Sequence, residues 1–428
     1  MNCGLTEVSA NIAAKSTDQQ CHFDAPAGYK NSEVGLIPKD WQVCALSDVT
    51  EFLDGNRRPI KSADRARISG DFPYYGASGI VDYVDDYIFD DDLILLGEDG
   101  ENILSRNLPL AFRVSGKIWV NNHAHVIKPK KEFDIGYLTA FLESLDYSLL
   151  NSGTAQPKLN KQSCLKIKVA KPSKEEQTVI AKALSDVDGL ISSMEALVTK
   201  KQAIKTAAMQ QLLTGRTRLP QFALREDGTP KGYKTSELGQ LPEDWGIVEL
   251  RDVSQFINGR AFSIHEWRAS GTPVIRLQNL TGRGEDYYYS NLQLPEKQYC
   301  HRGDLLFMWS ATFGPIIWKG DKAIFHYHIW KIECKSGYIE TFFYYLLSDM
   351  TEKLKSGSSS GGTMLHVTKG AMESTLAAFP VSAEQRAIAE VLSSMDEEIK
   401  SLEERLSKTR DIKQGMMQEL LTGKTRLI

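Results

Sequence analysis

LLTGRTRL occupies residues 212–219 of the sequence, and LLTGKTRL occupies residues 420–427. The two octapeptides differ at one position and start 208 residues apart (420 − 212). A match of this length within one chain indicates an internal repeat, which has to be interpreted before any local feature.

The residues before each octapeptide predict a long helix. Apolar side chains recur there with the spacing 4-3-4-3-4 in both copies, which is the narrow a/d seam of a coiled coil. Neither interior contains proline, and a helix over residues 174–213 would be roughly 60 Å long. The seam residues are Ile180, Leu184, Val187, Ile191, Met194 and Val198 in the first copy and Ile388, Leu392, Met395, Ile399, Leu402 and Leu406 in the second.

Sequence signals also mark the ends of both helices. Ser173 with Glu176, and Ser382 with Gln385, have the spacing of a capping box, although the two boxes are one residue out of step. Each helix ends at a glycine suited to the left-handed C′ position, followed by cations that complement the helix C-terminus. These residues are Gly215, Arg216 and Arg218 in the first copy and Gly423, Lys424 and Arg426 in the second.

Such a narrow seam needs a partner helix, and the nearest candidate is the other copy in the same chain. The alternative is two unrelated surface helices, each packed on its own domain. The matching registers favour an intramolecular pair that acts as a spacer.

Composition sets further limits. A length of 428 residues suggests about three domains, and an apolar content of 42% is ample for globular cores. The net charge of −4 means that any DNA-binding surface must be local or partly supplied by a partner. The six cysteines form no C-x-x-C motif and fit a reducing cytosol. The N-terminus does not resemble a secretory signal, and the most apolar stretch, residues 305–318, is too short for a membrane span.

A second repeated element precedes each helix. GYKNSEVGLIPKDW (28–41) matches GYKTSELGQLPEDW (232–245), and we expect Trp41 and Trp245 to anchor the cores. The chain is therefore predicted to consist of two tandem halves, each a globular domain followed by a helical rod. The predicted boundaries are an arm at 1–27, a first domain at 28–172, a central helix at 173–219, a second domain at 220–380 and a C-terminal helix at 381–428.

Both domains are predicted to be mixed α+β. The shared framework is accompanied by divergent loops, such as 56–70 and 260–271, which is typical of a varied binding surface. Predicted strands are 83–89, 92–97 and 118–127 in the first domain and 273–277, 304–309 and 323–334 in the second. A helix and a polar loop follow each set, at 136–150 and 151–162 and at 337–350 and 356–370.

The sequence contains no convincing catalytic motif. Residues 423–425 read GKT, but Gln418 stands where a P-loop needs glycine, and no glycine-rich dinucleotide loop follows a strand. The sequence also lacks a tetrapeptide of the Asn-Pro-Pro or Asp-Pro-Pro type, which is typical of amino-methyltransferases. Asp321 with Glu333 and Lys335 vaguely fits a nuclease core, but the first half has no counterpart.

Two His-x-His pairs, His123 with His125 and His326 with His328, recur in the two halves. On a strand such a pair shares one face, but a zinc site needs three or four ligands, and no companion ligand stands at motif spacing. We therefore expect no metal, and interpret the pairs as polar strand ends that are hydrogen-bonded in the fold or face DNA.

A local nucleic-acid signal lies in the divergent loops. Arginine, glutamine and asparagine are the side chains that read guanine and adenine edges, and lysine and hydroxyl groups suit phosphates. The alternative is an ordinary solvated surface. The candidates are Arg57, Arg58, Lys61, Arg65, Arg67, Asn151, Thr154, Gln156 and Lys158 in the first half, and Arg260, Arg268, Arg276, Gln278, Asn279, Arg283, Lys355 and Ser358 in the second.

From residue 28 to 428 the chain resembles the specificity subunits of type I restriction-modification enzymes. The resemblance rests on the doubled G-Y-K-x-[ST]-E-[VL]-G…P-x-D-W opening, the doubled E-Q…I-A helix start (Glu176, Gln177, Glu384 and Gln385) and the doubled L-L-T-G-[RK]-T-R-L end. Residues 74–90 and 97–100 also resemble segments of the family's first domain. The acidic balance and the 27-residue arm are departures from the pattern.

The resemblance implies two target-recognition domains, each reading half of a split double-stranded DNA site, held apart by antiparallel coiled-coil helices. It implies a non-catalytic, cytoplasmic subunit that docks two adenine methyltransferase subunits and is joined by motor-nuclease subunits. This chain would bind no cofactor, and S-adenosylmethionine, ATP and Mg are expected on the partner subunits.

Two other interpretations stay open at this stage. One is an enzyme, a nuclease or methyltransferase with an unrecognised site, which would be active as the purified chain alone. The other is the DNA-reading subunit of a related two-subunit system with a fused nuclease and methylase, which neighbouring genes would distinguish.

Overall fold

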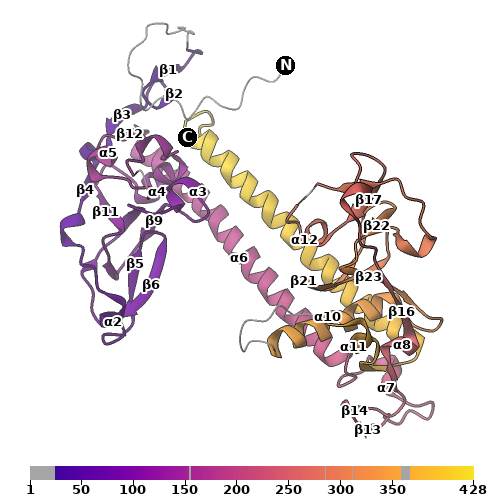
Figure 1. Cartoon of the computed structure of the whole chain (residues 1–428). Coiled ribbons are helices and arrows are strands. Elements are labelled where there is room, and N and C mark those ends of the chain that lie inside the picture. Colours follow the sequence, from indigo (N-terminus) through magenta and orange to yellow (C-terminus); the bar gives the residue numbers. More distant parts are fainter. Residues whose placement is uncertain (1–24, 154–155, 285, 311, 358–366) are drawn as a thin grey trace. The chain divides into compact units, whose positions relative to one another are not determined.

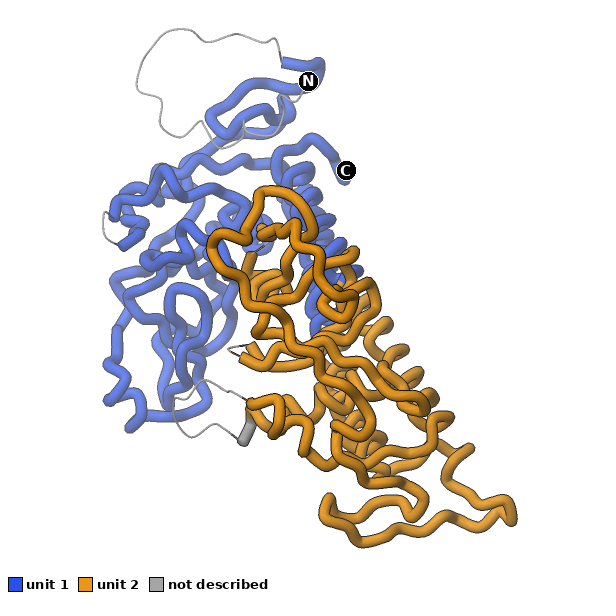
Figure 2. Tube along the Cα trace, turned by 45° about the vertical axis from the view of Figure 1, so that its right-hand side comes forward, with its two compact units in different colours: residues 1–195, 404–428 blue, residues 196–403 orange. Residues whose placement is uncertain are grey.

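The computed structural model describes residues 25–153, 156–284, 286–310, 312–357 and 367–428. The chain divides into two compact units (Figure 2). Unit 1 comprises Met1–Glu195 and Glu404–Ile428, and unit 2 comprises Ala196–Glu403. Each unit therefore combines one globular domain with a segment from each long helix. Residues 1–24 of the predicted arm lie outside the described residues.

Unit 1 contains twelve strands and several short helices among its described residues, besides its helix segments. Its strands are β1 (Tyr29–Ser32), β2 (Gly35–Pro38), β3 (Gln42–Ala45), β4 (Thr50–Phe52), β5 (Phe72–Gly76), β6 (Gly79–Val84), β7 (Phe89–Asp90), β8 (Leu93–Gly97), β9 (Ala111–Val114), β10 (Lys117–Val120), β11 (Ala124–Pro129) and β12 (Lys168–Lys171). Its helices are α1 (Leu46–Val49), η1 (Asp54–Asn56), α2 (Ser62–Arg65), α3 (Asn102–Ser105), α4 (Ile135–Ser144), η2 (Ser148–Leu150) and α5 (Lys161–Leu165).

The described residues of unit 2 contain a matching set. Its strands are β13 (Tyr233–Ser236), β14 (Gly239–Pro242), β15 (Gly246–Glu249), β16 (Ser254–Asn258), β17 (Thr272–Ile275), β18 (Tyr288–Ser290), β19 (Tyr299–Cys300), β20 (Leu305–Ser310), β21 (Thr312–Ile317), β22 (Ala323–Phe325), β23 (Ile329–Cys334) and β24 (Leu376–Phe379). Its helices are α7 (Pro220–Ala223), α8 (Leu250–Val253), η3 (Ile264–Glu266), α9 (Leu277–Leu280), η4 (Glu296–Gln298), α10 (Glu340–Gly357) and α11 (Lys369–Glu373).

Sheet topology is the same in the two units. The order β4-β11-β8-β9 in unit 1 corresponds to β16-β23-β20-β21 in unit 2, and β6-β5-β10-β7 corresponds to β18-β17-β22-β19. The hairpins β1-β2 and β13-β14 and the pairs β12-β3 and β15-β24 complete the match. In each unit one described strand pair is parallel, β5 with β10 and β17 with β22. The predicted mixed α+β fold with an internal repeat is confirmed.

Several predicted strands are wrong because a turn interrupts them. Residues 118–127 form two strands, β10 and β11, which belong to different sheets. The break occurs at Asn121, whose side-chain oxygen accepts a hydrogen bond from the backbone N–H of His123 at 2.7 Å. Residues 323–334 divide in the same way into β22 and β23, and residues 83–89 divide after Val84. The predicted helix 136–150 ends at Ser144, and the predicted helix 337–350 extends through α10 to Gly357.

Two helices of 39 residues, α6 (Lys174–Leu212) and α12 (Ser382–Leu420), provide the rods. In unit 1, Asp188 of α6 pairs with Lys413 of α12 at 2.6 Å, and in unit 2 Lys201 pairs with Glu398 at 2.7 Å. Residue numbers rise along α6 as they fall along α12, so the helices run antiparallel (Figure 1). All twelve predicted seam residues are buried or half-buried. No helix in the described part of the chain has the length and apolar character needed to cross a bilayer.

The repeated octapeptides pack against the globular domains. Leu420 and Leu421 join the unit 1 core around Trp41, and Leu212 and Leu213 join the unit 2 core around Trp245. As expected, both tryptophans are buried. The octapeptide that ends the central helix therefore packs on the second domain, and the one that ends the chain packs on the first.

A polar cluster fixes each of these contacts. Docking cluster 1 consists of Asp40, Trp41, Glu176 and Arg426, and docking cluster 2 of Asp244, Trp245, Glu384 and Arg218. The buried carboxylate of Glu176 accepts hydrogen bonds from Trp41 Nε1 at 3.0 Å and from Arg426 Nε at 2.5 Å. In docking cluster 2, Glu384 accepts them from Trp245 Nε1 at 3.3 Å and from Arg218 Nε at 2.8 Å. Each arginine also pairs with the aspartate of its cluster.

The glycine of each octapeptide is required by this packing. Gly215 and Gly423 have φ values of +67° and +69°, so the predicted left-handed helix ends are confirmed. A Cβ at Gly423 would lie 2.5 Å from Cδ of Pro38 and 3.0 Å from Cζ2 of Trp41. Any larger residue would therefore separate the octapeptide from its domain.

The predicted capping boxes are only partly correct. Ser173 Oγ accepts a hydrogen bond from the backbone N–H of Glu176 at 3.2 Å, but the Glu176 carboxylate serves docking cluster 1. The second box is wrong, because Ser382 is already helical and the backbone N–H of Gln385 bonds to Val381 O. The equivalent residues at the two helix starts are instead Gln177 and Gln385. Their side chains accept hydrogen bonds from the backbone N–H groups of Asp134 and Ile339.

The two docking clusters predict that equivalent mutations, Glu176→Ala and Glu384→Ala, lower the stability of their units by different amounts. Glu384→Ala would leave Arg218, whose side chain is 5% exposed, without its buried partner, and we expect a loss of about 3–5 kcal/mol in the stability of unit 2. Glu176→Ala should cost unit 1 less, because the Arg426 side chain is 34% exposed and can be solvated. Hydrogen exchange resolved by peptide measures the two units separately, and equal losses would contradict this assignment.

Candidate nucleic-acid interface

A network of charged side chains joins the variable loops of unit 1. Glu98, which follows β8, pairs with Arg57 at 2.6 Å and with Lys158 at 3.3 Å. His125 on β11 bonds through Nδ1 to Asp54 at 2.8 Å and through Nε2 to the Leu159 carbonyl at 3.0 Å. The network thus holds the segments around residues 54–57, 98 and 158–159 together.

The pKa values of three groups in this network are shifted, and that of His125 is shifted most. Burial alone would lower the pKa of His125, but the hydrogen bond to Asp54 and the neighbouring Cys164 outweigh it and raise the pKa to about 10. Burial would raise the pKa of Glu98, yet Arg57 and His125 hold it below its usual value. The pKa of Asp54 is lowered in the same way by His125. His125 is therefore a buried cation that is balanced by two carboxylates at neutral pH.

Unit 2 carries aromatic rings and arginines in the segments that follow β16 and β17 and in β18. The cation–aromatic stack consists of Arg260, Phe262, Trp267, Tyr288 and Arg276 in that order. The guanidinium of Arg260 lies 4.8 Å from the Phe262 ring centroid, and Phe262 stacks on Trp267 at 4.9 Å. Trp267 contacts Tyr288 at 4.7 Å, and the guanidinium of Arg276 lies 4.0 Å from the Tyr288 centroid.

Electrostatics differ at the two ends of this stack. Arg260 forms an ion pair with Glu266, and this contact lowers the pKa of Glu266 to about 2. His326 lies beside Phe262 and Trp267. Burial, His328 and Arg276 lower the pKa of His326 to about 4, so it is neutral at pH 7. The stack therefore has one compensated arginine and a neutral imidazole at its side.

The predicted residues of unit 1 have different surroundings. Arg57 and Lys158 meet at Glu98, as described above. Arg65 forms an ion pair with Asp82 at 2.8 Å, and its guanidinium group lies over the Tyr74 ring. The side-chain oxygen of Asn151 accepts hydrogen bonds from backbone N–H groups of its own loop. Arg58, Lys61, Arg67 and Gln156 are exposed, and Thr154 lies outside the described residues.

Six predicted residues of unit 2 lie on or near the stack. Arg268 donates to the carbonyls of His265 and Trp267, and Asn279 accepts a bond from the backbone of Arg276 and donates to the carbonyls of Gly284 and Asp286. Arg260 and Arg276 form the ends of the stack, Gln278 is half-buried and Arg283 is exposed. Lys355 instead pairs with Glu352 on α10, and Ser358 lies outside the described residues.

The two His-x-His pairs are not structurally equivalent. The backbone N–H of Glu98 bonds to His123 O at 2.8 Å, and that of Trp309 bonds to His328 O at 3.3 Å. His123 therefore corresponds to His328, and neither pair lies on one strand as predicted. Within the described residues, no group of three or more His, Cys, Asp or Glu side chains is arranged to hold a metal ion.

Sequence reasoning missed the acidic and aromatic members of both sites. Glu98 and His125 organise unit 1, but their partners are 41 and 71 residues away in sequence, which no local motif shows. In unit 2 the interleaving of Phe262 and Trp267 with arginines was a visible signal. Aromatic rings between arginines are typical of surfaces that contact bases.

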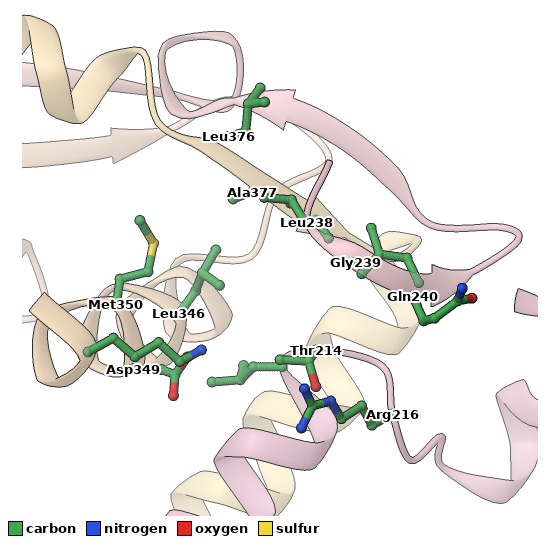
Figure 3. Close-up of a pocket in the computed structure, with 14 residues that line it drawn as sticks. Thr214, Arg216, Leu238, Gly239, Gln240, Leu346, Asp349, Met350, Leu376 and Ala377 are labelled. Carbon is green, nitrogen blue, oxygen red and sulfur yellow. The ribbon is translucent and has the colours of Figure 1, made fainter. Parts of the chain in front are cut away.

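Unit 2 also contains a pocket of about 490 Å³ that no residue of the stack lines. Figure 3 shows its lining side chains. It lies between the end of α6, represented by Thr214 and Arg216, the β13-β14 hairpin, α10 and β24. No predicted DNA-contact residue lines it. It belongs to the region where the octapeptide meets the second domain.

With both sites defined, the chain can be compared with known proteins. The family model for the type I restriction modification DNA specificity domain matches residues 38–206 and 242–409. A putative type I restriction enzyme specificity subunit of Haemophilus influenzae is 26% identical, covering 84% of this chain and 89% of that protein. The MjaVIII specificity subunit of Methanocaldococcus jannaschii is 27% identical, covering 91% and 94%.

Solved structures share the fold. The S subunit of a type I restriction-modification system from M. genitalium has a TM-score of 0.56 at 14% identity, covering 89% of this chain and 96% of that one. A chain from a structural study of complex assembly and conformational transition in the type I R-M system has a TM-score of 0.52 at 15% identity, covering 91% and 99%.

Each match to the family model covers one globular domain and most of the helix that follows it. Together the two matches span most of the sequence. The chain belongs to the type I restriction-modification DNA specificity family, and it is a non-catalytic member of such a system.

The buried cation of unit 1 predicts a pH dependence. Because the pKa of His125 rises from about 6.5 when unfolded to about 10 when folded, its stabilisation is complete below about pH 6.5. It is lost as pH rises toward 10, by up to about 1.4 kcal/mol per pH unit. Denaturant unfolding of wild type and His125→Gln should therefore differ less at pH 10 than at pH 6.5. A difference that stays constant over this range would contradict a charged His125.

Proposed function

We propose that the two units read the two halves of a bipartite double-stranded DNA sequence, one unit for each half-site. The chain is the DNA-recognition subunit of a type I restriction-modification complex and carries out no catalysis itself. The charge network of unit 1 and the cation–aromatic stack of unit 2 are the surfaces that we assign to DNA contact.

One observation carries this proposal: the two domains share their strand order but differ in side chains at equivalent positions. Two of those positions lie at the ends of the parallel strands, and the other two lie in or directly after neighbouring strands of the second four-stranded sheet. The backbone hydrogen bonds around them correspond in the two units. A common scaffold with different functional groups suits two readers of different base sequences. The equivalent residues are Gly76 and Arg276, Glu98 and Trp309, Asn121 and His326, and His125 and Trp330.

The partners follow from membership of the family. The chain docks two methyltransferase subunits and is joined by restriction subunits. We propose that S-adenosylmethionine, ATP and Mg²⁺ bind to those partners and that this chain binds none of them. We also place the complex in the cytoplasm, which the free thiols of the four described cysteines support.

Replacing the variable part of one unit tests the assignment of half-sites. Residues 254–375 would be exchanged for those of a relative, which leaves Trp245 and the β15-β24 pair unchanged. The complex with its methyltransferase subunits should then methylate a motif in which one half is new and the other is retained. Sequencing of methylated bases in a host that carries the complete system measures the motif.

A matched exchange of residues 50–166 in unit 1 serves as the control and should alter only the other half. If either exchange changes both halves of the motif together, one domain does not read one half-site.

A further inference from the structure

Arg276 occupies a distinctive position in unit 2. It directly follows β17, whose last residue, Ile275, lies beside Phe325 of the parallel strand β22. The backbone N–H of His326 bonds to Ile275 O at 2.9 Å and closes this end of the strand pair. The backbone N–H of Arg276 bonds to the side chain of Asn279 at 2.9 Å. The main chain that carries Arg276 is therefore fixed on both sides.

Most other polar candidates near the stack are already used within the protein. Arg260 pairs with Glu266, whose second oxygen accepts a bond from the backbone of Ser263. Arg268 and Asn279 are bonded to backbone carbonyls. These side chains shape the loops between residues 260 and 286. Arg260 keeps a buried Nη1 without a hydrogen-bond partner, but its charge is compensated by Glu266.

Arg276 differs from them because its charge is not compensated. Among the described residues it forms neither an ion pair nor a side-chain hydrogen bond, and its Nε is buried without a hydrogen-bond partner. A buried N–H without an acceptor is unfavourable, so the side chain is held there by its contact with the Tyr288 ring. The two terminal nitrogens remain as donors for a ligand.

Stacking on Tyr288 fixes the plane of the guanidinium group. A planar fork held in one orientation loses little freedom when it forms two parallel hydrogen bonds. The O6 and N7 atoms of guanine accept such a pair in the major groove, and this is the commonest base-specific contact of arginine. Lysine cannot reproduce it because an ammonium group is a point charge.

Resting on the proposed function, we propose that Arg276 reads a guanine in the half-site recognised by unit 2 and that Tyr288, Trp267 and Phe262 position its guanidinium group. Unit 1 lacks this device, because Gly76 and Asn121 occupy the positions of Arg276 and His326. This position therefore contacts a base only in the half-site that unit 2 recognises.

The test uses the complete complex with its methyltransferase subunits. Binding is measured to a series of duplexes in which each base pair of the unit 2 half-site is replaced in turn. Wild type should bind a duplex with one particular G·C pair replaced about 5- to 150-fold more weakly. Arg276→Ala and Arg276→Lys should lose this discrimination at that position and retain it at the others. Tyr288→Ala should weaken discrimination at the same position, because it releases the guanidinium group.

Arg283→Ala is the matched comparison, since Arg283 is exposed and lies in the same segment. It should weaken binding to all duplexes by a similar factor, as a phosphate contact does. The same uniform weakening in Arg276→Lys, or unchanged discrimination, would overturn the proposal. Thermal unfolding shows whether Arg276→Ala is folded, and Arg276→Lys preserves the charge and provides the answer if it is not.

The outcomes also separate this inference from the proposed function. If exchange of residues 254–375 changes one half of the methylated motif but Arg276 variants discriminate as wild type does, only the role of Arg276 is wrong. If the exchange leaves the motif unchanged, the assignment of unit 2 to a half-site fails.

Discussion

A buried glutamate at the start of each long helix is the interaction on which this architecture depends. Glu176 and Glu384 are each 1% exposed, and a carboxylate at that depth is stable only when its charge and lone pairs are satisfied. Each is satisfied by a tryptophan N–H of its own domain and by an arginine of the repeated octapeptide. The arginine comes from the end of the other helix, so each domain is complete only when the antiparallel partner helix is in place.

This constraint explains why the framework repeats while its loops differ. The octapeptide, the Pro-x-Asp-Trp segment and the glutamate contact one another, and a change in one would disturb the others. Among the described residues, the charge network and the cation–aromatic stack share no side chain with the docking clusters. Unit 1 can therefore use a protonated histidine with two carboxylates where unit 2 uses stacked Trp309 and Trp330, without any change in strand order.

The sequence was most informative where periodicity or repetition encodes a contact. The seam spacing predicted both helices, and the range expected for the first, 174–213, exceeds the observed helix by one residue at its C-terminal end. The repeated glycines predicted the left-handed helix ends. It was less informative where one polar residue decides a turn, as Asn121 does between β10 and β11. Arginine-rich loops could be located, but their roles could not, because whether Arg57 or Arg260 is free depends on Glu98 and Glu266. Glu98 is distant in sequence from Arg57. Glu266 is close in sequence to Arg260, but only the conformation of the loop brings the two side chains together.

The central claim is that each domain is complete only when a repeated octapeptide packs on its tryptophan and its buried glutamate. Because the two octapeptides differ at one position, a domain that lacks its own octapeptide should accept the other copy. Sedimentation of a chain ending at residue 219 tests it most directly, because this half contains docking cluster 1 without Arg426. We predict a dimer in which the segment 212–219 of each copy packs on Trp41 of the other and Arg218 replaces Arg426 beside Glu176. Arg218→Ala should weaken the dimer. A monomer with a fully formed helix over residues 174–212 would contradict the account.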